Sequence, residues 1–148
     1  MKVNTNHIHL LHVDTQTILF KDFEKPTKTN FKIDIGHHVQ HNLKEGLIKI
    51  GLKIRINAEA HKNKGEAVFL IDSHFKIDEM NTYYSLNEDN KPKFEGLLII
   101  TLTSIAYSTA RGVVLEKLSK TNLAGIVLPI VDPINLLGKP IAKQVQER

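Results

Sequence analysis

The chain has 148 residues, of which 41% are hydrophobic; this length and composition favour one folded domain over residues 1–148 and exclude a disordered chain. It contains no cysteine, which excludes disulfides, thiolate nucleophiles and cysteine metal sites and fits a cytoplasmic location. The net charge of +4 is small, and the basic residues alternate with acidic ones along the predicted strands, so no nucleic-acid-binding stripe is indicated.

Residues 1–45 carry short strand patterns separated by polar segments. Residues 1–11 are polar and rich in histidine, unlike a signal peptide. Residues 7–13 alternate loosely and predict a short strand, and residues 18–20 form a second apolar group. Phe31, Ile33 and Ile35 alternate with polar residues, which predicts another strand that ends at Gly36. The polar residues 37–45 are expected to form a linker.

The strongest pattern in the chain lies at residues 48–60. Its even positions are all apolar, from Ile48 to Ala60, and most odd positions are polar or charged. Because successive side chains of a strand point to opposite faces, this pattern predicts a long strand with one apolar face. A hairpin loop at residues 61–65 and a return strand at 66–77 complete a predicted four-stranded antiparallel meander, whose apolar face must be covered.

Residues 80–95 are predicted to form a long crossover loop that carries Tyr83 and Tyr84. Long loops within a domain are often functional, so these tyrosines either bind a ligand or hold the loop on the sheet. Residues 96–120 are a predicted long helix whose apolar residues extend beyond one stripe, so a partner subunit or the C-terminal segment must cover its second face. Its most apolar run, residues 97–106, is shorter than the roughly 18 residues of a membrane span, and no membrane insertion is predicted.

The C-terminal part reads as an apolar loop at residues 121–131 followed by a short helix. Asp132 and Pro133 form a favoured pair for a helix start, as N-cap and first helical residue. Ile134, Leu137, Ile141 and Val145 share one face of this predicted helix, which Pro140 is expected to kink or end. Residues 139–148 are predicted to be a polar tail, and the fold class is α+β.

Two stretches near the C-terminus resemble the C-terminal half of the SecB family of bacterial export chaperones. They are ARGVVLEKLSK at residues 110–120 and LPIVDPINLL at residues 128–137. The predicted order of elements is also similar to that family across residues 7–145. The resemblance implies a four-stranded antiparallel sheet, a crossover loop, a long helix that contains an Ala-Arg pair, an apolar loop and a short second helix.

The resemblance also implies a function, a set of site residues and an assembly. Family members bind unfolded or extended polypeptides without catalysis or cofactors, and they form dimers that pair into tetramers with the long helices between two sheets. Carried onto this chain, the polypeptide-binding groove is expected at Tyr83, Tyr84, Leu86, Phe94, Ile134 and Leu137. The oligomer interface is expected at Leu98, Leu102, Ile105, Ala106, Thr109 and Val113.

The charge of the chain departs from the family pattern. Family members present an acidic sheet face to the export translocase motor, whereas the polar face of the strand at 48–60 carries Lys49, Lys53 and Arg55. This charge opposes docking to that motor as a partner. Some family members instead chaperone a partner antitoxin, so the alternative is a non-catalytic adaptor or structural oligomer that holds one specific protein.

Other chemistry finds little support in the sequence. Two histidine groups, at residues 7–12 and 37–41, contain ligand-type side chains, but surface histidines explain them more simply and no metal site is predicted. The hydroxyls of Ser104, Ser108 and Thr109 have no histidine or lysine base placed near them by the sequence, so no enzymatic activity is predicted. Tyr107 is expected to be packed with a bonded hydroxyl, and Arg111 either bridges to an acid across an interface or caps carbonyls.

Overall fold

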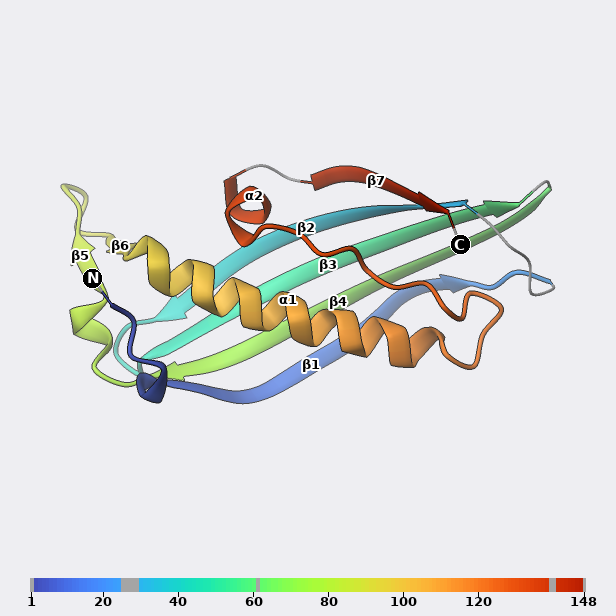
Figure 1. Cartoon of the computed structure of the whole chain (residues 1–148). Coiled ribbons are helices and arrows are strands. Elements are labelled where there is room, and N and C mark those ends of the chain that lie inside the picture. The colour runs from blue at the N-terminus through green and yellow to red at the C-terminus, as the bar shows by residue number, and fades with distance from the viewer. Residues whose placement is uncertain (1, 25–29, 61, 139–140, 148) are drawn as a thin grey trace.

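A long antiparallel sheet forms one layer of the molecule and the helix α1 lies across one of its faces (Figure 1). The computed structural model describes residues 2–24, 30–60, 62–138 and 141–147. The strands of the sheet are β1 (Ile8–Lys21), β2 (Asn30–Asn42), β3 (Leu47–Ala60), β4 (Asn63–Ile77) and β7 (Ile141–Glu147). The remaining elements are the 3₁₀ turns η1 (Thr5–His7) and η2 (Met80–Thr82), the hairpin β5 (Tyr84–Leu86) and β6 (Pro92–Phe94), and the helices α1 (Gly96–Leu118) and α2 (Pro133–Gly138).

The strand β3 forms the centre of the sheet, as its alternating sequence predicts. Ile50, Ile54 and Ile56 are fully buried on the face toward α1, whereas Lys53 and Arg55 are exposed on the other face. Its neighbours β2 and β4 contribute further buried side chains to the same layer. Each large aliphatic side chain contributes about 1.5–3 kcal/mol when it is fully buried, so this face is the main source of stability.

The strands around β3 are longer than predicted. The predicted linker at residues 37–45 is wrong over most of its length, because β2 continues to Asn42. The predicted five-residue hairpin loop is also too long, since Ala60 already pairs with Asn63. Pairing with a strongly apolar neighbour extends a strand into segments whose own composition is polar, which explains both differences.

The order of the strands, β1-β4-β3-β2-β7, differs from a simple meander. Strands β2, β3 and β4 are consecutive both in the sequence and in the sheet. Strand β1, which continues through residues 18–20, pairs with β4. At the opposite edge of the sheet, β7 pairs with β2. Residues 141–147 therefore form a strand, so the predicted polar tail is wrong over most of its length and residues 141 and 145 do not belong to a helix. Pro140 lies outside the described residues. The predicted class, α+β with four antiparallel strands, one long helix and a short second helix, is confirmed.

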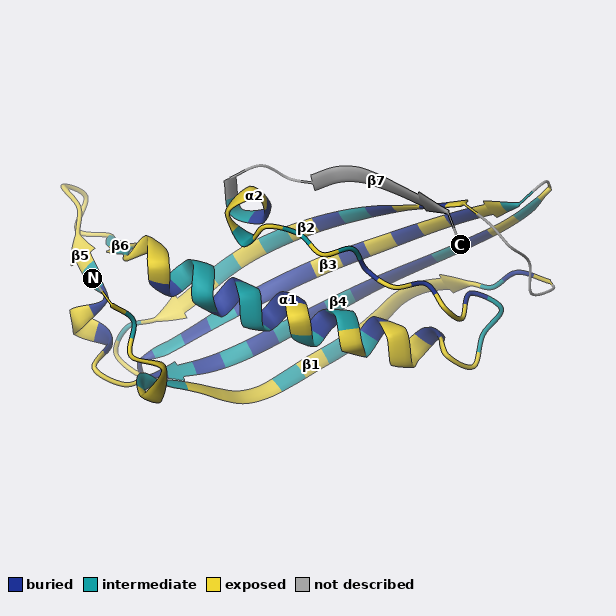
Figure 2. Ribbon diagram, in the orientation of Figure 1, coloured by how far each residue is buried: buried dark blue, intermediate teal, exposed yellow. Residues whose placement is uncertain are grey.

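The helix α1 packs on β3 and β4 through residues spaced four apart. The buried series is Leu98, Leu102, Ala106, Ala110, Val114 and Leu118. Figure 2 shows the central strands beneath it mostly buried, whereas β1 at the edge is largely exposed. The helix α1 is long and apolar enough to cross a membrane, since 18 of its residues have a mean hydropathy of 1.5. The apolar run is therefore longer than the ten residues, 97–106, considered in the sequence. A core helix passes the same test, and here one face of α1 is covered by the sheet.

The Thr103→Val variant is expected to be more stable than the native chain. Thr103 is fully buried, and its hydroxyl has no hydrogen-bond partner. Because an unsatisfied buried hydroxyl costs about 1–3 kcal/mol, replacing it by a methyl of similar shape should raise the free energy of unfolding by about 1 kcal/mol. Urea titration measures this, with Thr101→Val as the control because the Thr101 hydroxyl donates to the Leu97 carbonyl at 2.7 Å. A decrease in stability of Thr103→Val would contradict the prediction.

Candidate functional site

The segment predicted as a crossover loop contains a small hairpin at one end of the sheet (Figure 1). Tyr84 of β5 pairs with Phe94 of β6, and their rings meet edge to face with centroids 6.0 Å apart. Phe94 also meets the ring of His41 on β2, at 5.3 Å. Leu86 is 54% exposed. The hairpin therefore presents aromatic and aliphatic surface beside the end of β2.

Tyr83 does not share this exposed surface, although the sequence placed it in the binding groove. Its side chain is only 3% exposed, and its hydroxyl forms a 2.8 Å hydrogen bond with His7 Nδ1. The backbone N–H of Asn4 donates to the same hydroxyl at 3.3 Å. Tyr83 thus anchors the N-terminal turn η1 to the hairpin region. The sequence offered no signal for this role, because both partners lie more than 70 residues away in the chain.

The short helix α2 begins as predicted, since the Asp132 side chain accepts a hydrogen bond from the Ile134 N–H at 2.9 Å. It contacts both α1 and β2. Leu136 is fully buried in this contact and Leu137 is partly buried. Ile134 is 59% exposed. Of the two predicted groove residues on α2, Ile134 is therefore the more accessible.

The apolar loop before α2 is tied to α1 by two side chains. The Tyr107 hydroxyl donates to the Pro129 carbonyl, and Arg111 Nε donates to the Leu128 carbonyl at 3.0 Å. Burial raises the pKa of Tyr107 to about 12, while the positive charge of Arg111 acts in the opposite direction. The predicted packing of Tyr107 with a bonded hydroxyl is confirmed, and of the two roles left open for Arg111 the structure shows carbonyl capping. A partly open pocket of about 180 Å³ lies beside these bonds and is lined by residues of α1, the loop and α2.

The six residues predicted for the oligomer interface divide into two groups. Leu98, Leu102 and Ala106 are fully buried against the chain's own sheet and are unavailable to a partner. Ile105, Thr109 and Val113 are partly exposed, so only these three of the six remain candidates for contact with a partner subunit.

The two histidine groups seen in the sequence are dispersed by the fold. His7 bonds to Tyr83, and His9 Nε2 lies 2.7 Å from Asp78 Oδ2, a hydrogen bond that lowers the pKa of the Asp78 carboxyl. In the second group, the His38 ring lies over Gly51 and His41 lies against Phe94. Neither group converges on one point.

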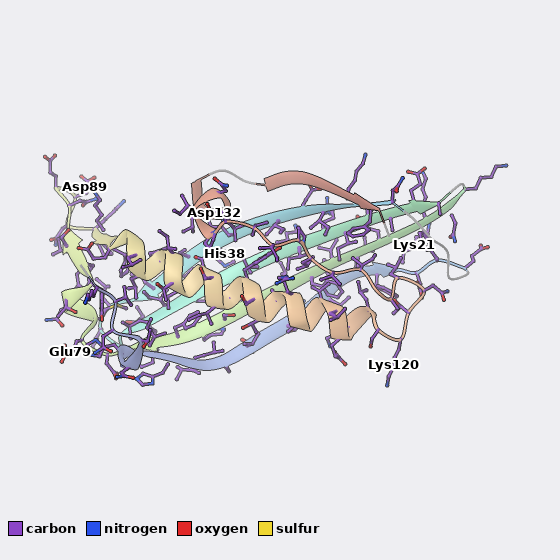
Figure 3. All side chains as sticks on the ribbon, viewed as in Figure 1. Lys21, His38, Glu79, Asp89, Lys120 and Asp132 are labelled. Atoms are coloured by element: carbon purple, nitrogen blue, oxygen red, sulfur yellow. The ribbon has the colours of Figure 1, made fainter. Side chains whose placement is uncertain are left out.

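The polar face of the sheet, opposite α1, has a different character from the hairpin end. A hollow of about 920 Å³ is lined there by Lys21, Lys32, Arg55 and Glu66, with Arg55 Nε 3.6 Å from Glu66 Oε1. In Figure 3, Lys21 marks this end of the sheet, whereas Asp89 marks the hairpin at the other end. The mixed charges of this hollow do not match the apolar character of a client-binding groove, and they also differ from the acidic face implied by the SecB resemblance.

Comparison with known proteins identifies the fold. No protein-family model and no curated protein matches the sequence. Among solved structures, the chain is similar to the SecB-like chaperone Rv1957 of Mycobacterium tuberculosis, determined in complex with a ChAD peptide from the HigA1 antitoxin Rv1956. The identity is 17%, the TM-score is 0.52, and the match covers 84% of this chain and 87% of that one. The SecB-like fold expected from residues 110–137 is thereby confirmed.

Proposed function

We propose that this SecB-like chain binds non-native or extended polypeptide through the apolar residues of the β5–β6 hairpin and α2. The observation that carries the proposal is the exposure of Leu86 and Ile134, which are both more than half accessible. Both side chains lie on the elements where the SecB resemblance places the polypeptide-binding groove. The likeness to a chaperone that was solved with a bound peptide supports polypeptide as the partner.

The chemistry of this surface suits clients of varied sequence. Tyr84, Phe94, Leu86 and Ile134 offer contact area without requiring particular hydrogen-bond partners. Folded proteins bury most of their large apolar side chains, whereas unfolded chains expose them. The surface should therefore discriminate in favour of unfolded chains, by binding alone and without a catalytic step.

The proposal includes a homo-oligomer in the cytoplasm. The outer face of α1 leaves Ile105, Thr109 and Val113 partly exposed, and Leu97 and Leu115 are exposed on the same helix. The chain's own sheet buries only the inner face of α1, and a second copy of the chain packed on the outer face would bury that face as well. A dimer or a tetramer meets this requirement. The basic polar face of β3 argues against a role at the export motor.

A second candidate is an adaptor dedicated to one protein, such as an antitoxin. It is favoured by the antitoxin peptide held by the M. tuberculosis chaperone of the same fold. The two candidates differ in client range. A general chaperone suppresses the aggregation of unrelated unfolded proteins, whereas a dedicated adaptor binds one partner tightly and leaves the others to aggregate.

The Leu86→Ser, Ile134→Ser double variant is expected to bind an unfolded client roughly 10- to 100-fold more weakly than the native chain. The estimate follows because each aliphatic side chain contributes about 1.5–3 kcal/mol when fully buried, only part of which is gained on a surface, and 1.4 kcal/mol is a factor of about ten. Fluorescence anisotropy with a labelled, reduced and unfolded polypeptide measures the affinity. Light scattering with the same client measures the mass of the complex.

Ile18→Ser is the matched control, because Ile18 is a similarly exposed aliphatic residue on β1 at the other side of the sheet. It should leave client affinity unchanged. The folded form of the client should add no mass to the native oligomer. Equal affinity of the double variant and the native chain would overturn the assignment of the binding surface. Equal binding of folded and unfolded client would overturn the chaperone proposal itself.

A further inference from the structure

The polar face of the sheet brings together three metal-ligand side chains from two strands. His12 and Asp14 lie on β1 and His74 lies on the neighbouring β4. His74 Nε2 is 2.9 Å from Asp14 Oδ2, and His12 Nε2 is 3.6 Å from the same oxygen. The two imidazole rings stack, with centroids 4.1 Å apart and planes within 14° of parallel, so one ring must turn about its side-chain bonds before both ring nitrogens point at one ion. One ligand atom from each residue lies within 4.8 Å of the other two.

A break in the strand register produces this arrangement. His9 and Lys76 are partners on the polar face, and an unbroken alternation would next place Leu11 and Val13 on that face. Instead the register shifts between Leu10 and His12, so one extra residue is accommodated in β1. After the shift, His12 pairs with His74 and Asp14 pairs with Asp72. The local sequence of β1 gives no sign of the shift, which is why the histidines at residues 7–12 did not reveal the site.

We propose that His12, Asp14 and His74 bind a divalent transition-metal ion, with Zn²⁺ as its simplest probe. Zinc bonds to histidine nitrogen and carboxylate oxygen are about 2.0–2.2 Å long, so two ligand atoms on one ion at tetrahedral or octahedral angles lie roughly 3–3.5 Å apart. The distances of 2.9 and 3.6 Å to Asp14 Oδ2 are close to that range, and the shorter one is a hydrogen bond that the two metal bonds would replace. Two imidazoles and one carboxylate suit Zn²⁺ and neighbouring first-row ions better than Mg²⁺ or Ca²⁺, which prefer oxygen ligands.

The surroundings leave the site accessible for an ion. His12 and Asp14 have more than half of their side chains exposed, and His74 has 28% exposed. A hollow of about 280 Å³, lined in part by Leu11, His12, His74 and Lys49, adjoins the cluster and has room for water as a further ligand. The cationic residue Lys49 is paired with His74 in the register, but its ammonium group lies 3.8 Å from Asp72 Oδ2. Asp72 therefore offsets the charge of Lys49 beside the site.

None of the three proposed ligands belongs to the proposed client surface, although the adjoining hollow is also lined by His41, which lies against Phe94. The side chains of His12, Asp14 and His74 lie on the sheet face opposite α1. Leu86 and Ile134 belong to the hairpin and to α2 instead. Metal binding therefore does not rest on the chaperone proposal, and either can fail without the other.

The test is titration of the full-length, untagged chain with Zn²⁺ by isothermal calorimetry, with metal content after equilibrium dialysis measured by mass spectrometry. The native chain is expected to bind one ion per chain. His12→Ala and Asp14→Asn should each weaken binding at least ten-fold, because loss of even a residue that only supports a ligand costs about 10- to 100-fold. Both side chains are largely exposed, so these variants should keep the fold, which circular dichroism checks.

His9→Gln is the matched control, since His9 lies on the same strand and the same face but is paired with Asp78. It should bind Zn²⁺ as the native chain does. Binding should weaken on acidification, because only the neutral imidazole is a ligand and protons compete with the ion. Failure of the native chain to bind, or retention of full affinity by His12→Ala and Asp14→Asn, would overturn the proposal. An equal loss in His9→Gln would overturn it as well, by showing that binding is shared among surface histidines.

Discussion

The Phe69→Ala variant is expected to lose about 3–5 kcal/mol of unfolding free energy, the usual range for removing a buried phenylalanine side chain. Phe69 lies on β4 with only 2% of its surface exposed, next to its cross-strand neighbour Ile54. Domains of this size are stable by about 5–15 kcal/mol, so the loss is a large share of the total. Urea unfolding followed by circular dichroism gives the free energy directly.

Leu70→Ala is the control for this result. Leu70 is the next residue of β4 and points to the polar face, where it is only partly buried. Its replacement should cost clearly less than that of Phe69, because fewer contacts are lost. Similar losses at the two positions would contradict the assignment of faces in β4 and, with it, the register that brings His74 beside β1.

The Tyr107→Phe variant is expected to lose about 1–3 kcal/mol at neutral pH. The change leaves the Pro129 carbonyl without its donor in a buried contact, and this range is the usual cost of an unsatisfied buried acceptor. Thermal unfolding at neutral pH measures the loss. Tyr84→Phe is the control for stability, because Tyr84 is less buried than Tyr107 and should tolerate the change with a smaller effect.

Because of Tyr107, the free energy of unfolding is expected to depend on pH in the alkaline range. Its pKa is about 12 in the folded protein, above the ordinary value of 10.0, because burial disfavours the phenolate. The folded state therefore holds the proton more tightly than the unfolded chain. The resulting stability is fully present below pH 10 and is lost as the pH rises through about 12. The difference between the native chain and Tyr107→Phe should shrink across that window, and a constant difference would contradict this account.

The elements with strong periodicity were predictable from the sequence. The alternation in β3 and the four-residue spacing in α1 each depend on neighbours within one element, so local sequence specifies them. The start of α2 was equally clear, because the Asp132 cap and Pro133 act within one turn. The SecB-like fold followed from the order of these elements together with residues 110–137.

The features that sequence did not reveal depend on pairing between distant segments. The position of β1 beside β4, and the strand β7 beside β2, are set by which edges of the central hairpins remain free. Tyr83 and Tyr84 are adjacent and chemically alike, and the buried one, Tyr83, is hydrogen-bonded to the distant N-terminal turn. The meeting of His12 with His74 requires both the strand order and the register shift in β1.

The position of β1 also has a consequence for how the chain is made. Strand β1 leaves the ribosome before its partner β4, so Ile8 is made well before Ile77, and this part of the sheet can close only afterwards. At translation rates of about 5–20 residues per second, that interval is roughly 3–14 s. The hairpins β2–β3 and β3–β4 close much shorter loops and are favoured to form first. During this interval β1 has no strand to pair with, so a nascent chain of this fold passes through an unpaired state of the kind that we propose its finished form recognises in other proteins.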